Sequence, residues 1–404
     1  MRLIRRAAAT LTVVAAFLYT QGASAQEVKK LEEPKQEEIK KEDHPKDKHW
    51  YDRISIGGYT QFRYSRLLES NEDLKFETDK SVGHNGGFLL RRARIQIKGD
   101  VSDFLYIYLQ PDFANTIGEN MHAPQIRDWY GDIAVDHDKE LRFRVGQSKV
   151  PYGFENMQSS QNRIAIERTD ALNTAVPGER DIGIMAYWAP KEIRARFKHL
   201  VESGLKGSGD FGMVGIGAYN GQSINIKEKN DDKHFVAHAT YPFKISKQFL
   251  EVGAHAYTGS INVAKGDKIT GNDNHLDTRV AGSVIFYPQP IGFQAEYNVG
   301  KGPELSGKEV VVKPLHGGYA MTMVRIEATP LHVLTPFARV AHYEGGRKNE
   351  INSPHNSIKE LESGLEWQYR KWLELTAALN LSQREVNDKS QEGRVVRLQL
   401  QFNY

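Results

Sequence analysis

Basic side chains recur at positions of the same parity in two short stretches of the sequence. Arg92, Arg94 and Lys98 share one parity in the first stretch, and Arg142 and Arg144 repeat the spacing in the second. Successive side chains of a β-strand point to opposite faces, so each stretch would present a row of cations on one face. A guanidinium donates two hydrogen bonds at once to a phosphate, whereas a lysine acts as a point charge. These rows therefore predict attraction of small anions.

The segments that carry these rows alternate between apolar and polar residues. Leu141, Phe143 and Val145, for example, fall on the face opposite Arg142 and Arg144. From about residue 54 to the last residue this period of two recurs, which indicates β-strands rather than helices. The alternation is clearest in residues 54–64, 93–98, 105–110, 141–145, 250–257, 373–381 and 396–404.

These strands predict an all-β fold, a transmembrane antiparallel β-barrel. Their polar faces are too often charged to line a packed core, and amphipathic helices that could cover the apolar faces are not evident. Segments of about ten alternating residues, punctuated by Gly, Asn, Asp and Pro, are typical of a barrel with lipid outside and water inside. Closure then gives every backbone N–H and C=O group a partner. About 350 residues suit sixteen strands best, with fourteen or eighteen as alternatives.

Aromatic residues near the expected strand ends fit the two girdles that such a barrel places at the membrane interfaces. Tyr404, which ends a segment containing Leu398, Leu400 and Phe402, fits the closing strand. The aromatic residues expected in the girdles are Tyr59, Phe62, Tyr64, Phe88, Trp129, Trp188, Phe286, Tyr287, Trp367 and Trp372.

Composition excludes several other classes of protein. The chain has no Cys, which excludes a disulfide scaffold, Cys-ligated metal sites and thiol chemistry. Its mean hydropathy of −0.56 excludes a bundle of transmembrane helices. The 14 His residues form no H-E-x-x-H motif, so we expect no metal site and no other cofactor.

The N-terminus predicts export. Residues 1–25 have a basic start, a short apolar run and an A-x-A ending, the three parts of a cleavable secretory signal peptide. Its removal takes three arginines and turns the formal charge of +3 into about zero, so no nucleic-acid partner is expected. Residues 26–50 are mostly Glu and Lys and predict a disordered periplasmic spacer. Residues 51–404 form the predicted barrel.

One segment interrupts the alternation. Residues 148–181 separate two strand patterns, and a loop of this length is usually functional. In a barrel it either extends outward or folds inward and narrows the lumen. Its apolar residues favour packing against the inner wall; they are Phe154, Met157, Ile164, Ile166 and Leu172.

Particular runs of residues resemble the phosphate-selective porin O/P family. GQSKVPYGFEN at 146–156 and ERTDALNT at 167–174 are similar to the start of its constriction loop. RRARIQIKGD at 91–100 and YLQPDF at 108–113 resemble its early strands, and GIGAYNGQ at 215–222 and FQAEYNVGKG at 293–302 its later ones. The resemblance runs from about residue 54 to residue 404. It implies a homotrimer of sixteen-stranded barrels in a bacterial outer membrane, surrounded by lipid and lipopolysaccharide, each passing small anions such as phosphate.

The candidate substrate-binding residues follow from two sources. The resemblance implies that Arg92 and Arg94 lie on the wall of the lumen and that Lys149 lies at the start of the loop. Parity and position in the loop add Arg142, Arg144, Arg163, Arg168 and Arg180.

Parity also turns acidic side chains inward, and these leave two interpretations open. In the first, the basic groups make the pore selective for anions; in the second, they pair with the acids, as in a general or weakly selective porin. The inward acids are Asp100, Asp112, Asp128, Asp132, Glu251, Glu296, Glu366 and Glu374.

An outer-membrane barrel enzyme is a less favoured alternative. It would need a nucleophile and a base at the rim of the barrel. His255, His316, His332 and His342 lie in or beside strands, but no G-x-S-x-G motif accompanies any of them. A purely adhesive barrel is disfavoured by the polar inner rows, which suit a conduit.

Overall fold

A computed structural model describes residues 49–68, 86–117, 120–329, 332–386 and 389–404. The predicted signal peptide and nearly all of the predicted spacer lie outside the described residues. The elements are η3 (Trp50–Arg53), β1 (Ile54–Leu67), β2 (Gly87–Asp100), β3 (Leu105–Ile117), β4 (Asn120–Ala134), β5 (Leu141–Lys149), α1 (Phe154–Met157), α2 (Asp170–Asn173), β6 (Arg180–Trp188), α3 (Lys191–Glu202), β7 (Val214–Tyr219), β8 (His234–Ile245), β9 (Gln248–Asn262), β10 (Asn274–Phe286), β11 (Ile291–Ser306), β12 (Glu309–Val324), β13 (Ile326–Thr329), β14 (His332–Gly346), β15 (His355–Arg370), β16 (Leu373–Val386) and β17 (Lys389–Asn403).

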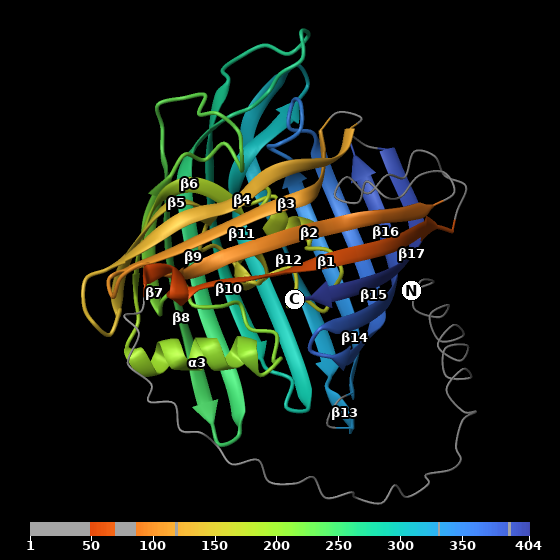
Figure 1. Ribbon diagram of the computed structural model, residues 1–404. Coiled ribbons are helices and arrows are strands. Elements are labelled where there is room, and N and C mark those ends of the chain that lie inside the picture. Colours follow the sequence, from red (N-terminus) through yellow and green to blue (C-terminus); the bar gives the residue numbers. More distant parts are fainter. Residues whose placement is uncertain (1–48, 69–85, 118–119, 330–331, 387–388) are drawn as a thin grey trace, which may run out of the picture. The chain divides into compact units, whose positions relative to one another are not determined.

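The strands form one closed antiparallel barrel (Figure 1). Each strand pairs with its neighbours in the sequence, and β17 pairs back onto β1, with Asn403 opposite Tyr59. The segments β12 and β13 are separated only by Arg325 and both pair with β14, so they form one interrupted strand. The predicted sixteen-stranded barrel is therefore confirmed.

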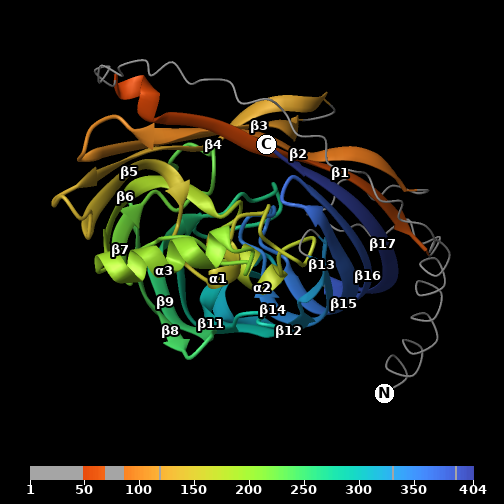
Figure 2. The same ribbon diagram turned by 60° about the horizontal axis from the view of Figure 1, so that its bottom comes forward.

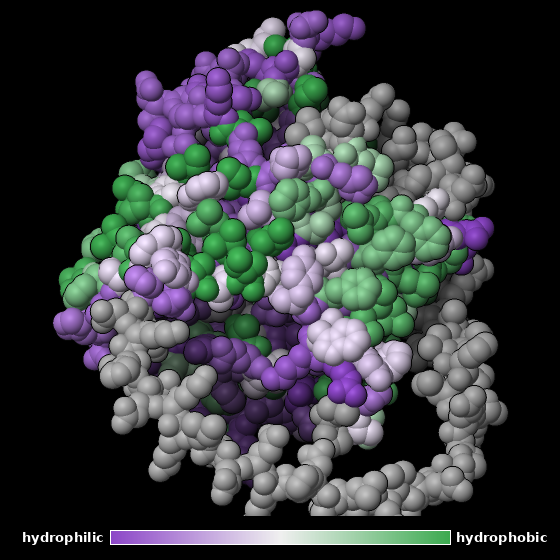
Figure 3. Space-filling model, viewed as in Figure 1, coloured by the Kyte–Doolittle hydropathy of each residue, from purple (hydrophilic) through white to green (hydrophobic). Residues whose placement is uncertain are grey.

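The two faces of the strands divide as the alternation predicts. On β1, Ile56 is 76% exposed on the outside, whereas Arg63 is fully buried on the inside. On the face shown in Figure 3, hydrophobic side chains form a belt across the middle, with hydrophilic residues above it. Such a belt is what the hydrocarbon region of a membrane requires.

Most of the ten aromatic residues that were expected in the girdles lie on the outer face of the barrel, but two of them do not. Tyr59 and Tyr287 are fully buried, so their placement in a girdle was wrong. Tyr59 shares the inward parity of Arg63 and accepts a hydrogen bond of 2.7 Å from Arg94. The hydroxyl of Tyr287 donates to Glu251 on the inner wall, also at 2.7 Å. A tyrosine can thus lie on the lumenal face when its hydroxyl finds a hydrogen-bond partner there.

The alternating strand directions define two ends of the barrel. The start of β1 and the end of β17 lie at one end, here called the terminal end, together with the β6–β7 connection. The β5–β6 connection lies at the opposite end. Both connections turn inward, and they build the site described below.

The β6–β7 connection contains α3, a helix that the sequence analysis did not predict. Ile193, Phe197 and Leu200 recur at helical spacing and are almost fully buried on one face. The helix follows Pro190, whose fixed φ suits a helix start, and ends before Gly204, which has a φ of +71°. Among the described residues, every helix is too short or too polar to cross a membrane.

Candidate functional site

The β5–β6 connection, residues 150–179, lies inside the ring of strands and is here called the inner loop. Figure 2 shows α1 and α2, the two short helices of this loop, within the ring. Lys149 and Arg180 pair as the last rungs of the β5–β6 ladder, so the loop is two residues shorter at each end than the predicted 148–181. The inward fold of this segment agrees with the prediction.

The inner loop is bonded to strands on the β10–β15 side of the barrel. Backbone N–H groups of Phe154 and Glu155 donate to the two carboxylate oxygens of Glu296 on β11, at 2.6 and 2.7 Å. Arg279 on β10 donates to the hydroxyl of Thr174 at 3.0 Å. Arg339 on β14 pairs with Glu155 at 2.8 Å. Charged and backbone groups together therefore hold the loop against this wall.

Apolar packing completes the attachment. The five apolar residues that predicted packing against the inner wall are each at most 3% exposed. Met157, Ile164, Ile166 and Leu172 belong to one buried cluster that also includes wall residues such as Tyr319. Burial of such side chains contributes about 1.5–3 kcal/mol each relative to exposure. The prediction of packing against the wall is confirmed.

The turn at Gly153 depends on glycine. Its φ is +79°, a conformation that side chains other than glycine rarely adopt. A Cβ atom at this position would also lie 2.8 Å from Leu172 Cδ1 and 3.2 Å from Glu296 Oε2. The loop can therefore approach Glu296 only because residue 153 lacks a side chain.

On the side of the loop that faces β1 and β2, the loop carboxylate Glu167 contacts three arginines of these strands. Its oxygens lie 2.5 Å from Arg63, 2.9 Å from Arg91 and 3.8 Å from Arg92. Arg91 and Arg92 are consecutive, yet both reach this carboxylate. The register between β1 and β2 shifts between Gln61 and Phe62, and such a bulge turns an extra residue inward.

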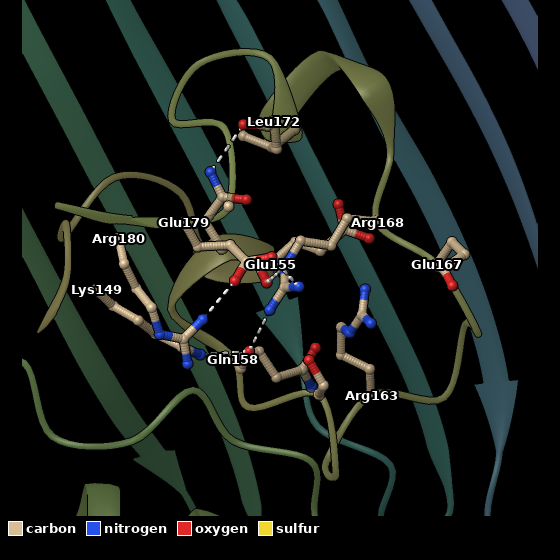
Figure 4. A network of polar contacts seen from close by, with 12 residues as sticks. Lys149, Glu155, Gln158, Arg163, Glu167, Arg168, Leu172, Glu179 and Arg180 are labelled. Atoms are coloured by element: carbon tan, nitrogen blue, oxygen red, sulfur yellow. Dashed lines mark hydrogen bonds and ion pairs between the residues drawn. The ribbon is translucent and has the colours of Figure 1, made fainter. Parts of the chain in front are cut away.

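A second carboxylate, Glu179 at the end of the loop, forms ion pairs with three further arginines. Arg168 forms a close ion pair with it, Arg180 lies at 2.5 Å and Arg127 of β4 at 3.4 Å. Burial opposes ionisation of Glu179, but Arg168 and Arg180 outweigh it and hold the pKa of this carboxyl well below its usual range. Figure 4 shows the network, with Lys149 and Arg180 on the left and Arg163 and Glu167 on the right.

Lys149 and Arg163 differ from the other cations of the loop. Lys149 Nζ donates to the backbone carbonyls of Met157 and Gln158, at 2.8 and 2.7 Å. Arg163 donates to the carbonyl of Ile166 at 3.3 Å, and its Nε and Nη1 atoms are buried without a hydrogen-bond partner. Within the described residues, neither side chain forms an ion pair. Their charge is therefore not cancelled by a contacting carboxylate.

We call these groups the cationic cluster. Asp128 is the third carboxylate in it and pairs with Arg180 at 2.9 Å. Eight basic side chains thus surround three carboxylates, Glu167, Glu179 and Asp128. The basic members are Arg63, Arg91, Arg92, Arg127, Lys149, Arg163, Arg168 and Arg180.

The remaining predicted arginines are paired with other carboxylates, on the wall or in the β6–β7 connection. Arg94 lies 2.6 Å from Asp112 on the adjacent strand β3. Arg144 donates two hydrogen bonds to Asp132, at 2.7 and 2.8 Å. Arg142 lies 3.7 Å from the same Asp132 and 2.7 Å from Asp210. The structure therefore brings five of the eight candidates together and pairs the other three with carboxylates outside the cationic cluster, Arg142 and Arg144 both contacting Asp132.

The wall from β9 to β16 carries four of the predicted inward acids and is here called the acidic wall, and it also carries buried arginines such as Arg279 and Arg339. Glu251 accepts hydrogen bonds from Thr240 and Tyr287, and Glu296 from Tyr319 and the inner loop. Among the described ion pairs, neither carboxylate has a basic partner. Glu366 and Glu374 share Lys206, which comes from the β6–β7 connection.

A comparison with known families identifies the chain. The family described as phosphate-selective porin O and P matches residues 64–404. The chain belongs to this family. It is accordingly an outer-membrane porin, a channel rather than an enzyme.

Solved structures share the fold of this porin at low sequence identity. The outer-membrane channel DcaP of Acinetobacter baumannii has a TM-score of 0.55 and 12% identity, over 87% of this chain and 97% of that one. OmpF of Salmonella typhi, in complex with daunomycin, also has a TM-score of 0.55, with 10% identity over 87% and 97% of the two chains. The trimer form of OmpT of Vibrio cholerae has a TM-score of 0.52 and 9% identity, over 87% and 99%. No curated protein sequence matches the porin.

Three members of the cationic cluster were absent from the predicted site residues. Arg63 has the parity of Gln61 and was detectable by the same alternation as Arg92. Arg127 lies next to Asp128 on β4 and reaches Glu179 at 3.4 Å. Arg91 has the wrong parity for the lumen, and only the bulge brings it inward. No signal in the sequence marked that bulge.

Proposed function

We propose that this porin passes small anions, with phosphate as the main candidate, and that the inner loop is its constriction. The observation that carries the proposal is the excess of basic groups in the cationic cluster. In a narrow pore, fixed positive groups replace part of the hydration that an anion loses. Lys149 and Arg163 are the central selectivity residues because no carboxylate of the described residues forms an ion pair with them.

The arrangement of the cluster also suits fast passage. Passage requires sites that are numerous and weak, because one tight site would block flow. Arg63, Arg92 and Arg168 are each engaged by a carboxylate of the loop, so their attraction for a passing anion is reduced. A phosphate would move between several moderate sites rather than remain at one.

The alternative is a general porin with a lumen of mixed charge. The pairs Arg94–Asp112 and Arg144–Asp132 favour it, because each places opposite charges within 3 Å. Such pairs set up a transverse field without a strong preference for either sign of ion.

A salt-gradient recording distinguishes the two. The purified porin is placed in a planar bilayer with a KCl gradient, and the reversal potential is measured with and without millimolar phosphate. Anion preference and a phosphate-dependent fall in chloride current are expected. A reversal potential that shows cation preference would refute the proposed selectivity.

The proposed assembly is a homotrimer surrounded by lipid and lipopolysaccharide, reached after cleavage of residues 1–25, with residues 26–50 as a periplasmic spacer. The family and the trimer form of OmpT support the trimer. We expect a heat-sensitive trimer band in unheated gels of detergent extracts, and a mature N-terminus at Gln26 by mass spectrometry. A monomer in native mass spectra would contradict the assembly.

A further inference from the structure

A second segment enters the barrel from the terminal end. Residues 203–213 follow α3 and lead into β7, and we call them the crossing segment. Leu205 is 3% exposed, and Lys206, Ser208 and Phe211 are each 8% exposed. A connection with this degree of burial does not lie on the surface.

The crossing segment spans the barrel from one wall to the other. Lys206 Nζ lies 2.6 Å from Glu366 on β15 and 3.9 Å from Glu374 on β16. With β12 and β13 counted as one strand, β15 is eight strands from β6 in a ring of sixteen. Lys206 therefore contacts the wall diametrically opposite its own strands.

The near side of the crossing segment is equally fixed. Asp210 pairs with Arg142 at 2.7 Å and with Arg194 of α3 at 2.9 Å. His238 on β8 lies 2.7 Å from the carbonyl oxygen of Phe211. The segment is thus held at both walls.

The crossing segment also meets the inner loop. Gln158 Nε2 donates to the carbonyl of Lys206 at 2.6 Å. Phe154 of the loop shares a buried apolar cluster with Leu200 of α3 and with Leu205. Two segments that enter from opposite ends of the barrel therefore join within it.

Lys206 is charged where it lies. Burial alone would lower the pKa of its ammonium group, but Glu366 and Glu374 raise it above its ordinary value. Without this cation, the two carboxylates would face each other with no basic partner among the described ion pairs.

We propose that the crossing segment is a second selectivity element on the terminal-end side of the inner loop, with Lys206 as its specificity-determining residue. The inference rests on the proposed anion passage. An anion that has passed the cationic cluster next meets Glu366 and Glu374, which would repel it. Lys206 offsets this repulsion and keeps the acidic wall passable for anions.

The test compares reversal potentials of variants with that of the wild type. Lys206→Gln should lower the chloride-to-potassium permeability ratio by roughly three- to five-fold, as expected for one unit charge a few ångströms from an ion in water. Lys206→Arg should retain the wild-type ratio. The triple variant Lys206→Gln, Glu366→Gln, Glu374→Gln should recover or exceed it, because the carboxylates are also neutralised.

Lys198→Gln is the matched control. This lysine lies on the exposed face of α3, with 71% of its side chain exposed, and its loss should leave the ratio unchanged. A merely structural role for Lys206 would alter current noise or heat stability without moving the reversal potential, and that result would overturn the inference. So would failure of the triple variant to recover the ratio while it still forms the heat-sensitive assembly.

The two proposals fail separately. The sign of the wild-type reversal potential tests anion passage, whereas the inference is tested by the shift between variants. If the wild-type porin preferred cations and its reversal potential still shifted with Lys206→Gln, the proposed anion passage would be overturned, but Lys206 would remain a selectivity residue.

Discussion

The cationic cluster and the acidic wall use buried charge in different ways. In the cluster, eight basic groups share three carboxylates, so positive charge remains uncancelled. On the acidic wall, Glu296 is occupied by N–H groups of the inner loop and Glu251 by hydroxyl groups. One region therefore keeps uncancelled positive charge, while in the other Glu296 holds the inner loop and Glu251 bonds to hydroxyl groups outside that loop.

This difference shows that a count of lumenal charges does not predict selectivity. Buried charge must be paired or hydrogen-bonded, and the partner decides whether any field remains for a solute. Arg144 and Arg163 are both buried arginines, but Asp132 pairs with the first, whereas the hydrogen bond of the second within the described residues goes to a backbone carbonyl. Substitutions that change charge in one region and not in the other test whether the two regions differ in this way.

The largest effect is expected from Lys149→Glu combined with Arg163→Glu. This change removes the two cations of the cluster that form no ion pair within the described part of the chain, and it adds two anions beside the loop. We expect the chloride-to-potassium permeability ratio to fall by about ten-fold or more, given about 1 kcal/mol per charge at 4 Å in water. Reversal potentials under a KCl gradient measure it.

Lys198→Glu combined with Lys247→Glu is the matched control, because it makes the same change of charge on exposed residues of the terminal end. Equal shifts in both double variants would mean that the cationic cluster has no special position in the path. If the Lys149→Glu, Arg163→Glu variant does not assemble, Lys149→Gln combined with Arg163→Gln should shift the permeability ratio in the same direction by a smaller amount.

A second test acts on the wild-type porin through ionic strength. The Debye length falls from about 10 Å at 0.1 M salt to about 3 Å at 1 M. Anion preference that comes from uncancelled charge should weaken several-fold between these concentrations, and the Lys149→Gln, Arg163→Gln variant should show less salt dependence. Preference that is constant with salt would point to pore size instead of charge.

A third test concerns the acidic wall. Glu296→Gln removes one of the two acceptors used by the N–H groups of Phe154 and Glu155, which should destabilise docking of the loop by about 1–3 kcal/mol. We expect flickering single-channel currents and faster tryptic cleavage after Arg163 or Arg168. Glu327→Gln, at a largely exposed carboxylate, is the control. Steady currents from the Glu296 variant would show that the remaining contacts, the Arg339–Glu155 ion pair and the apolar packing among them, are enough to fix the loop.

The smallest effect is expected from Arg144→Gln combined with Asp132→Asn. The two charges already cancel across bonds of 2.7 and 2.8 Å, so their joint removal leaves the net charge of the wall unchanged. The permeability ratio should change by less than about two-fold, which corresponds to about 0.4 kcal/mol. A shift as large as that of the first variant would erase the distinction between paired and unpaired arginines.

Much of this architecture was predictable from alternation. The lumenal parity of Arg92, Arg94, Arg142 and Arg144 followed from a period of two and was correct for each, because one face of a lipid-exposed strand must be apolar. The inward fold of the loop followed from the apolar residues that interrupt its polar sequence. Both are local properties, which a single sequence records.

Other features depend on residues that are distant in the sequence. Glu167 meets Arg63 across 104 positions, and Lys206 meets Glu366 from the far wall of the barrel. The period of two also failed at Arg91, where a bulge between β1 and β2 adds a residue. The helix α3 escaped prediction because its apolar positions lie within a short segment dominated by charge.

Strand periodicity and the need to satisfy backbone polar groups in lipid predict the closed sheet, its two faces and its many inward cations from the order of residues alone. Which of these cations a carboxylate cancels is set by the folded barrel. Closure of the barrel and insertion of the inner loop and the crossing segment bring charged groups that are distant in the sequence to within a few ångströms of one another. This matters because charge interactions weaken with distance and with exposure to water.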